Sequence, residues 1–437
     1  MNPQHRPFVL SAVRALAALS ALAFTPAEIG PTYAIRNAKV VPVAGPFIEK
    51  GTLIIRDGLI EVLGPVDKVA IPEDAEIIEA EGLTAYPGLI SAHTNLLLEE
   101  PVRPPGSAAA AAAPTLPDIA FGGAAGPAQP PGNAEVLAFK LLKPKKATID
   151  AFLKIGFTTV LIAPNAGIFQ GQSVLVNLKG EKAEPMVLKN PAALHVNMTT
   201  ARGGYPSSLM GTIAYIRQSF LDADYYANAL ALYAKNPKGM KRPEFDAFLE
   251  AIVPYVRDKK PVIFQCNNWE DLKRVLKIVD EFKLNALLSQ ANEAWRDAAV
   301  LKKAGVPLLV TVDFRPPNQS RYVTQGEELR RKAEAEIYPA NAANLAKEGV
   351  KFALTTLGLG DASTALKAVQ GAIKAGLSRD EALKALTLIP AQYLGVAAQL
   401  GSLEPGKIAN VILTKGEIFD EKTQVEKVFV DGVLVKF

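Results

Sequence analysis

The middle of the chain alternates short apolar runs with amphipathic segments of helical period. Strands are expected at residues 261–264, 286–289, 307–312 and 352–357, and helices at residues 269–282, 294–304 and 335–348. Successive strands begin about 25 residues apart with a helix between most of them, a pattern typical of parallel β/α barrels. The sequence therefore predicts an α/β fold built on a (β/α)8 TIM-like barrel.

The segment from residue 147 to residue 256 continues this alternation. A helix is expected at residues 149–155, with Gly156 as its terminator. The other expected elements are a strand at residues 158–162, a hairpin-like insertion at 169–188, a strand at 193–198, and helices at 210–221 and 245–256. Together these elements place residues 87–400 in the predicted barrel.

Both ends of the chain are predicted to be rich in strands. The expected strands are residues 33–43, 51–56, 59–63, 76–80, 408–414 and 425–435. The dipeptides Asp57-Gly58 and Asp431-Gly432 favour tight hairpin turns. Because each end alone offers too few strands for independent stability, we expect residues 33–86 and 401–437 to share one composite domain.

Two segments depart from this regular pattern. Residues 101–133 are rich in proline and contain the alanine run Ala108–Ala113, so a flexible loop is expected there, after the first barrel strand. At the N-terminus, Arg6 and Arg14 precede an apolar run that ends in Ala21-Leu22-Ala23. This pattern predicts a signal peptide at residues 1–23 and export to the periplasm or the outside of the cell, although a disordered start would explain it too.

Composition narrows the classes of function. The chain has 437 residues, of which 49% are hydrophobic and 21% charged, so it can bury a large core. The net charge of +4 comes from scattered residues, which gives nucleic-acid binding little support. No apolar run approaches the length of about 20 residues that a membrane span needs. With one cysteine, Cys266, no internal disulfide is possible.

Within residues 83–98 an apolar run passes through Pro87-Gly88 and ends on His93, as expected of a first barrel strand, and barrel enzymes carry their chemistry at such strand ends. Its segment from Pro87 to Asn95 resembles the Pro-Gly-Leu-Ile-Asp-x-His-x-His signature of the amidohydrolase superfamily, most closely its imidazolonepropionase-like branch. Residues 205–207 and 386–395 resemble further elements of that branch. The resemblance implies a β/α barrel flanked by a small β-sandwich, one or two divalent metals such as zinc, and hydrolysis of non-peptide C–N bonds.

Most of the metal-binding positions that the resemblance implies hold other residue types. Ser91 stands at the aspartate position of the signature and Asn95 at its second histidine. The other matched positions hold Gln265 and Asn267 on the fifth strand and Gln290 on the sixth. The eighth strand has no aspartate in place, and Asp361 follows a few residues later. The strand-four position cannot be aligned.

The count of histidines leads to the same conclusion without any alignment. The chain has three, and removal of the signal peptide would leave His93 and His195. Zinc sites need three or more histidine, cysteine or carboxylate ligands, whereas Asn and Gln offer weak neutral oxygens. His93 could still bind metal with Asp361, but a hydrogen-bonded histidine in a polar pocket is favoured. His195 and Cys266 are expected to be buried structural residues.

Three functions follow from these residues. The favoured one is an amidohydrolase-family protein that has lost its metal centre and binds a small polar ligand or an active relative. Its ligand-binding residues are predicted to be His93, Asn95, Gln265, Asn267, Gln290 and Asp361, with no resident cofactor. The alternatives are an active hydrolase of a cyclic amide or peptide-like bond, and a structural scaffold. The sequence does not indicate the oligomeric state.

Overall fold

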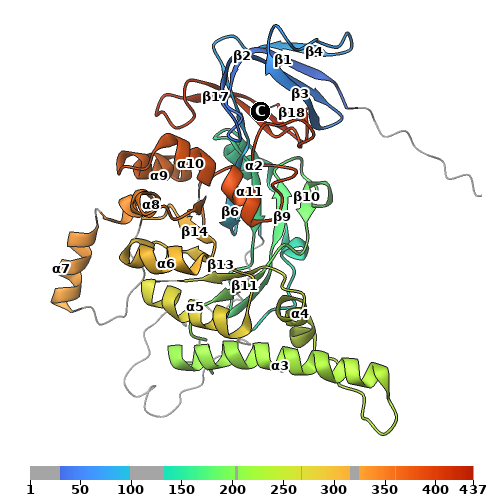
Figure 1. Ribbon diagram of the computed structural model, residues 1–437, viewed down its shortest axis with the longest axis vertical. Coiled ribbons are helices and arrows are strands. Elements are labelled where there is room, and N and C mark those ends of the chain that lie inside the picture. Colours follow the sequence, from blue (N-terminus) through green and yellow to red (C-terminus); the bar gives the residue numbers. More distant parts are fainter. Residues whose placement is uncertain are drawn as a thin grey trace, which may run out of the picture.

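The computed structural model describes residues 30–98, 132–201, 205–266, 268–314, 324–335, 337–359 and 361–436. It shows a mixed α/β fold in which a strand-rich part lies above two further sheets and their helices in the view of Figure 1. The predicted signal peptide lies outside the described residues, as does nearly all of the predicted loop at 101–133. Within the described ranges, no helix combines the length and the apolar character that a membrane span requires.

One sheet joins the two ends of the chain. Its strands are β1 (Tyr33–Val40), β2 (Ile48–Arg56), β3 (Leu59–Pro65), β4 (Glu76–Glu79), β5 (Thr84–Pro87), β16 (Val411–Lys415), β17 (Gln424–Val430) and β18 (Val433–Leu434). They follow the order β18-β17-β16-β5-β1-β2-β3, with β4 also paired to β1. β16 pairs antiparallel with β5, so the C-terminal strands extend the N-terminal ones. The division into domains stays a prediction.

The two predicted hairpin turns are confirmed. Asp57 and Gly58 have φ of 51° and 80°, and Asp431 and Gly432 have φ of 49° and 74°. Positive φ at both central residues is the backbone that a two-residue turn between twisted strands requires. The flanking residues pair across each turn, Arg56 with Leu59 and Val430 with Val433.

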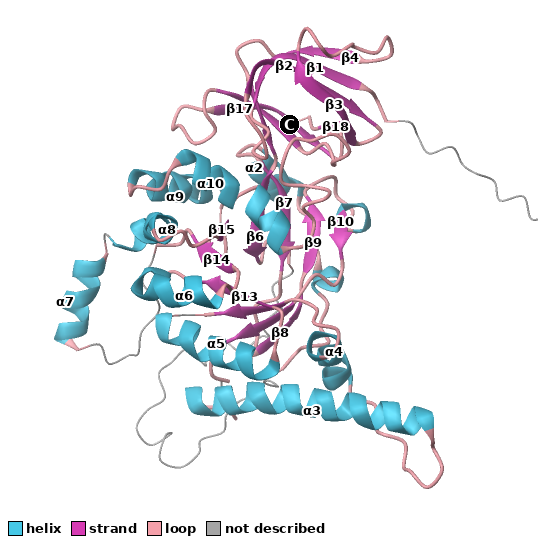
Figure 2. Cartoon of the chain, viewed as in Figure 1, coloured by secondary structure: helices cyan, strands magenta, loops and turns pink. Residues whose placement is uncertain are grey.

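The remaining strands form two sheets, seen below the first in Figure 2. The four-stranded sheet has the order β10-β9-β7-β6 and consists of β6 (Leu89–Thr94), β7 (Phe157–Ile162), β9 (Val174–Asn177) and β10 (Val187–Lys189). The six-stranded sheet has the order β15-β14-β13-β12-β11-β8. Its strands are β8 (Phe169–Gln172), β11 (Leu194–Asn197), β12 (Val262–Gln265), β13 (Ala286–Gln290), β14 (Leu308–Thr311) and β15 (Phe352–Thr355). β11 to β15 pair in parallel, as the alternating pattern predicts.

Side-chain hydrogen bonds connect these two sheets at one edge. Ser91 on β6 and Thr356, which follows β15, have their hydroxyl oxygens 2.9 Å apart. Thr355 donates from its hydroxyl to the carbonyl of His93 over 3.1 Å. β6 and β15, the first and last of the parallel strands, are therefore neighbours.

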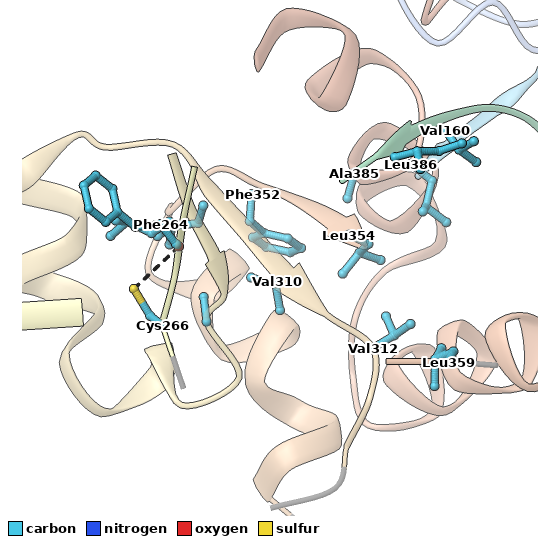
Figure 3. Close-up of a cluster of buried hydrophobic side chains, with 14 of the residues drawn as sticks. Val160, Phe264, Cys266, Val310, Val312, Phe352, Leu354, Leu359, Ala385 and Leu386 are labelled. Carbon is cyan, nitrogen blue, oxygen red and sulfur yellow. Dashed lines mark hydrogen bonds between the residues drawn. The ribbon is translucent and has the colours of Figure 1, made fainter. Parts of the chain in front are cut away.

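The helices cover the strands from outside (Figure 1). They are α2 (Lys146–Leu153), α3 (Leu209–Lys235), α4 (Ala247–Val256), α5 (Trp269–Phe282), α6 (Ala298–Ala304), α7 (Gln325–Glu334), α8 (Ile337–Lys347), α9 (Ala362–Lys374), α10 (Arg379–Ala385) and α11 (Leu388–Tyr393). α5 has the predicted bounds because Asn268 caps its first turn by accepting from the Asp271 N–H. Figure 3 shows the apolar core between strands and helices, with Val310, Phe352 and Leu354 among its members.

Three expected elements differ in detail. α3 continues to Lys235, well beyond the expected end at residue 221. The helix expected at 294–304 begins as the 3-10 turn Ala294–Asp297 before α6. The insertion at 169–188 is not one hairpin, because β8 pairs with β11 whereas β9 pairs with β10 and β7. α10 begins after Ser378, whose hydroxyl accepts from the Glu381 N–H at 3.2 Å.

Candidate functional site

His93 lies at the end of β6, buried inside the protein. Its Nδ1 is 2.6 Å from the hydroxyl oxygen of Ser289 on β13. This contact joins strands from the two lower sheets. A neutral imidazole has one donor and one acceptor nitrogen, so the serine hydroxyl can complement either form of the ring.

His195 on β11 lies next to His93, with the ring centroids 4.7 Å apart and the planes tilted by 57°. It is fully buried, as expected, and neither of its ring nitrogens has a hydrogen-bond partner among the described residues. An unpaired buried imidazole nitrogen is costly, because it has given up its hydrogen bond to water. This residue therefore contributes a free donor and a free acceptor beside His93.

Burial keeps both rings neutral. It lowers the pKa of His93 to about 3. It lowers the pKa of His195 well below the ordinary value, and repulsion from a charged His93 lowers it further. At neutral pH the pair is uncharged.

Two glutamines lie on strands adjoining this pair. Gln265 at the end of β12 is in register with Ser289, the hydrogen-bond partner of His93. The Gln265 side-chain oxygen accepts from Nε2 of Gln170 on β8 at 3.3 Å. The Gln170 side-chain oxygen is buried without a partner among the described residues. Gln265 and Gln170 thus lie on the two strands that pair with β11, the strand of His195.

The other predicted site residues differ from the histidine pair in exposure and in their contacts. Gln290 ends β13, one residue after Ser289, in a left-handed backbone with φ of 69°. Asn95 is exposed, and Asn267 lies outside the described residues. Asp361 is exposed and caps α9, accepting from the Thr364 N–H at 2.8 Å and from the Thr364 hydroxyl at 2.6 Å. These hydrogen bonds lower the pKa of Asp361 to about 2.

The donors in this region do not fit a zinc-type metal. Within the described ranges, no group of three or more histidine, cysteine, aspartate or glutamate residues is positioned to hold a metal ion. Cys266 is buried, its thiol faces the Phe264 carbonyl (Figure 3), and burial raises its pKa well above the usual value. A thiol in that state is a poor ligand, since metals bind the thiolate. Two imidazoles remain, fewer than a structural or catalytic zinc site uses.

Three contributors to this site went unpredicted. Ser289 and Gln170 belong to strand segments that were expected, but no local signal separates an inward-facing serine or glutamine from an outward-facing one. His195 was expected to be a structural residue because it lies in an apolar strand. Alternation along β11 and the register of β11 with β12 would place it on the face that His93 also reaches.

Comparison with known proteins shows similarity between this chain and amidohydrolases. A model described as the amidohydrolase family matches residues 265–435. An amidohydrolase from Thermotoga maritima MSB8 is similar over 92% of this chain and 99% of its own, with 26% identity and a TM-score of 0.76. A prolidase complexed with N-methylphosphonate-L-proline shares the fold, at 17% identity over 93% of this chain and 99% of its own, with a TM-score of 0.55.

One curated relative matches over a short segment. A 5-methylthioadenosine/S-adenosylhomocysteine deaminase from Moorella thermoacetica is 36% identical over 62 residues, which span 14% of this chain and 14% of the relative. Because the match covers so little of either protein, it does not extend the deaminase activity to this chain.

Proposed function

From the premise that this chain belongs to the amidohydrolase superfamily, we propose that it has lost the metal centre and binds a small polar ligand at His93 and His195. The observation that carries this proposal is the buried histidine pair, in which His195 has two unpaired nitrogens. Neutral imidazoles and amides offer donors and acceptors but no charge to activate a metal-bound water.

The chemistry of the groups near the histidine pair restricts the ligand. A buried charge without a partner is strongly unfavourable, and the groups found around the pair are neutral. The part of the ligand that reaches His195 is therefore uncharged and both donates and accepts hydrogen bonds. Gln170 adds a further unpaired acceptor.

The scaffold of this site is part of the same proposal. β6 and β15 are neighbours, and parallel strands run between them in the two lower sheets. These contacts support a closed (β/α)8 barrel at residues 87–400, with a composite β-sandwich from residues 33–86 and 401–437 beside it. Deletion of residues 401–437 should speed hydrogen exchange in residues 33–86, because β16 covers the edge of β5. Unchanged exchange would contradict the composite domain.

An exported mature protein that begins near Phe24 also belongs to this proposal. Its support is the pattern of Arg6, Arg14 and the apolar run up to Ala23. N-terminal sequencing of the protein from its native source is the test. Recovery of Met1 would contradict export with cleavage.

An active hydrolase is the second candidate. The similarity to the Thermotoga maritima amidohydrolase over 92% of the chain favours it, as does the short deaminase match. In that case a divalent metal would supply activated water, with ligands beyond those described. An active relative as the partner, and a scaffold without a ligand, are the remaining alternatives.

Metal content and hydrolysis separate the candidates. The protein is purified without chelator, its zinc, manganese and iron are measured, and amide hydrolysis is assayed with and without chelator. We expect less than one metal per chain and no chelator-sensitive activity. A full equivalent of metal whose removal abolishes hydrolysis would establish the second candidate.

Thermal shift against a panel of neutral polar compounds then tests ligand binding. A hit should be lost in His195→Phe, which keeps an aromatic ring but removes both nitrogens, and kept in the exposed control Asn236→Ala. Stabilisation that persists in His195→Phe would place the ligand elsewhere. The combined variant Asn95→His, Gln265→His and Gln290→His should bind zinc more tightly than the wild type if these positions are matched correctly.

A further inference from the structure

The connection between α3 and α4 projects from the molecule as a tip, formed by residues 235–246. In Figure 1 the tip is the lower end of the ribbon, opposite the strand-rich part and away from the three sheets. The buried residues of α3 end at Tyr226, so the last turns of this helix carry the connection beyond the core. All residues of the tip except Pro243 are exposed.

Local hydrogen bonds give the tip a defined turn. The Asn236 side-chain oxygen accepts from the Lys238 N–H at 3.2 Å, and the Met240 N–H donates to the Pro237 carbonyl at 3.2 Å. The second bond closes a β-turn in which Gly239 has a φ of 74°. A methyl group added at Gly239 would meet no atom within 4 Å, so this side of the turn faces open space.

Two large apolar side chains of the tip are exposed to water. Phe245 is 77% exposed and Met240 is 43% exposed. Phe248, the next aromatic residue along the chain, packs against Phe169 with the ring centroids 5.2 Å apart. The core therefore takes up Phe248 and leaves Phe245 outside. Because an aromatic ring gains free energy when it leaves water, Phe245 is available to an apolar environment outside the protein.

Positive charges accompany these apolar side chains. Residues 235–242 contain four cations and no acidic residue, and the cations are Lys235, Lys238, Lys241 and Arg242. Among the described residues, only Lys241 of these four is in an ion pair, with Glu244 at 2.7 Å. Asp246, the other acidic residue of the tip, caps α4 by accepting from the Leu249 N–H. The tip therefore carries positive charge in excess, without internal partners for most of it.

We propose that the tip binds the surface of an anionic lipid bilayer. Met240 and Phe245 would enter the boundary between headgroups and acyl chains, and the four cations would lie against the lipid phosphates. Lysine and arginine suit this boundary, because their apolar stems lie along the acyl region while their charged ends stay among the headgroups. The proposal does not rest on the ligand proposed for the histidine pair.

A bilayer suits the tip better than a folded acidic protein does. A stable interface between two proteins buries about 800 Å² on each partner and needs a complementary surface. A short projecting turn offers separate side chains and little continuous area. A bilayer needs no matching shape, because its headgroups rearrange around each inserted side chain.

Flotation of the full chain with vesicles of about 30% phosphatidylglycerol in phosphatidylcholine tests the proposal. The double variant Lys238→Glu, Arg242→Glu should bind at least about tenfold more weakly than the wild type, because two attractive charges become repulsive. The double variant Met240→Ser, Phe245→Ser should also bind at least about tenfold more weakly, because it removes the apolar area that enters the bilayer. Residues 1–23 are unchanged in every variant, so a difference in binding arises at the tip.

A matched control reverses two charges elsewhere. Lys277→Glu with Lys303→Glu, at exposed positions of α5 and α6, should bind nearly as tightly as the wild type. Circular dichroism checks that each variant is folded. If the control loses as much binding as the tip variants, the vesicles respond to net charge alone and the proposal is overturned.

An environment-sensitive fluorophore on Met240→Cys reports whether the tip itself enters the bilayer. The native thiol of Cys266 is buried, so labelling is directed to position 240. On anionic vesicles the emission should shift to shorter wavelength and become protected from iodide, whereas the same fluorophore on the exposed Val300→Cys should show neither effect. An unchanged fluorophore at position 240, or equal vesicle binding by the wild type and both tip variants, would overturn the proposal.

Discussion

His93 on β6 and His195 on β11 lie side by side, with ring centroids 4.7 Å apart, at the place where the strand pattern puts the end of the first barrel strand. Ser289 satisfies one nitrogen of His93, whereas both nitrogens of His195 are unpaired among the described residues. Two imidazoles this close and this deeply buried are stable only while neutral. Protonation of these rings at low pH should therefore destabilise the folded protein.

The protein should lose stability as the pH falls from about 6.5 toward 3. In the unfolded chain each histidine binds a proton near pH 6.5, but burial holds the pKa of His93 at about 3 and that of His195 well below its usual value. The unfolded state therefore binds more protons in this window, and the free energy of unfolding rises with pH until about 6.5. Each histidine contributes a slope of about 1.4 kcal/mol per pH unit.

Urea unfolding between about pH 4.5 and 7 measures this slope. His195→Phe should remove about half of the slope that the two histidines add to the free energy of unfolding against pH. Asp361→Asn is the control, because the Asp361 carboxyl titrates below this window. Equal slopes in the wild type and in His195→Phe would mean that His195 is not buried as a neutral ring.

Asp361→Asn should leave the melting temperature nearly unchanged, whereas Asp361→Ala should lower it. The carboxylate caps α9, asparagine caps helices about as well as aspartate, and alanine does not. The pKa of about 2 means that this contribution is present above about pH 4 and disappears as the pH falls through 2. Thermal unfolding of the wild type, Asp361→Asn and Asp361→Ala measures whether their melting temperatures follow this order. If Asp361 were instead a metal ligand, Asp361→Asn would lower the metal content.

Asn410→Ala should lower the free energy of unfolding by about 3 kcal/mol, since three hydrogen bonds of a buried side chain are lost. The Asn410 amide donates to Thr159 at 3.1 Å and to Asn177 at 2.9 Å, and its oxygen accepts from the Asp431 N–H at 2.9 Å. These contacts tie the C-terminal hairpin to β7 and β9. The exposed control Asn236→Ala should change stability by less than about 0.5 kcal/mol. Similar losses in both variants would show that the network is not structural.

Much of the fold could be predicted because its signals are local. The bounds of α5 follow from the Asn268 cap and a strong amphipathic period, and both Asp-Gly hairpins follow from turn chemistry. The second half of α3 was missed. Its buried positions end at Tyr226, so the remaining turns present no apolar period to the core.

The candidate site could be predicted only in part, because its contacts join strands far apart in the sequence. His93 is separated by 196 residues from Ser289. The strand-end positions of His93, Gln265 and Gln290 follow from the pattern of apolar runs. The position of His195 beside His93 depends on strand register, and the exposure of Asn95 depends on the turn after β6. Patterns in a single sequence do not encode either.

The most direct test of the central claim is nitrogen NMR of the protein labelled with 15N-histidine. The chain has three histidines, and His5 belongs to the predicted signal segment, so His93 and His195 can be assigned with one substitution each. The account predicts two neutral imidazoles at pH 7, unprotonated at pH 5, whose nitrogen shifts do not change when one equivalent of zinc is added. Protonated rings at pH 7, or a stoichiometric zinc-dependent shift of both histidines, would contradict it.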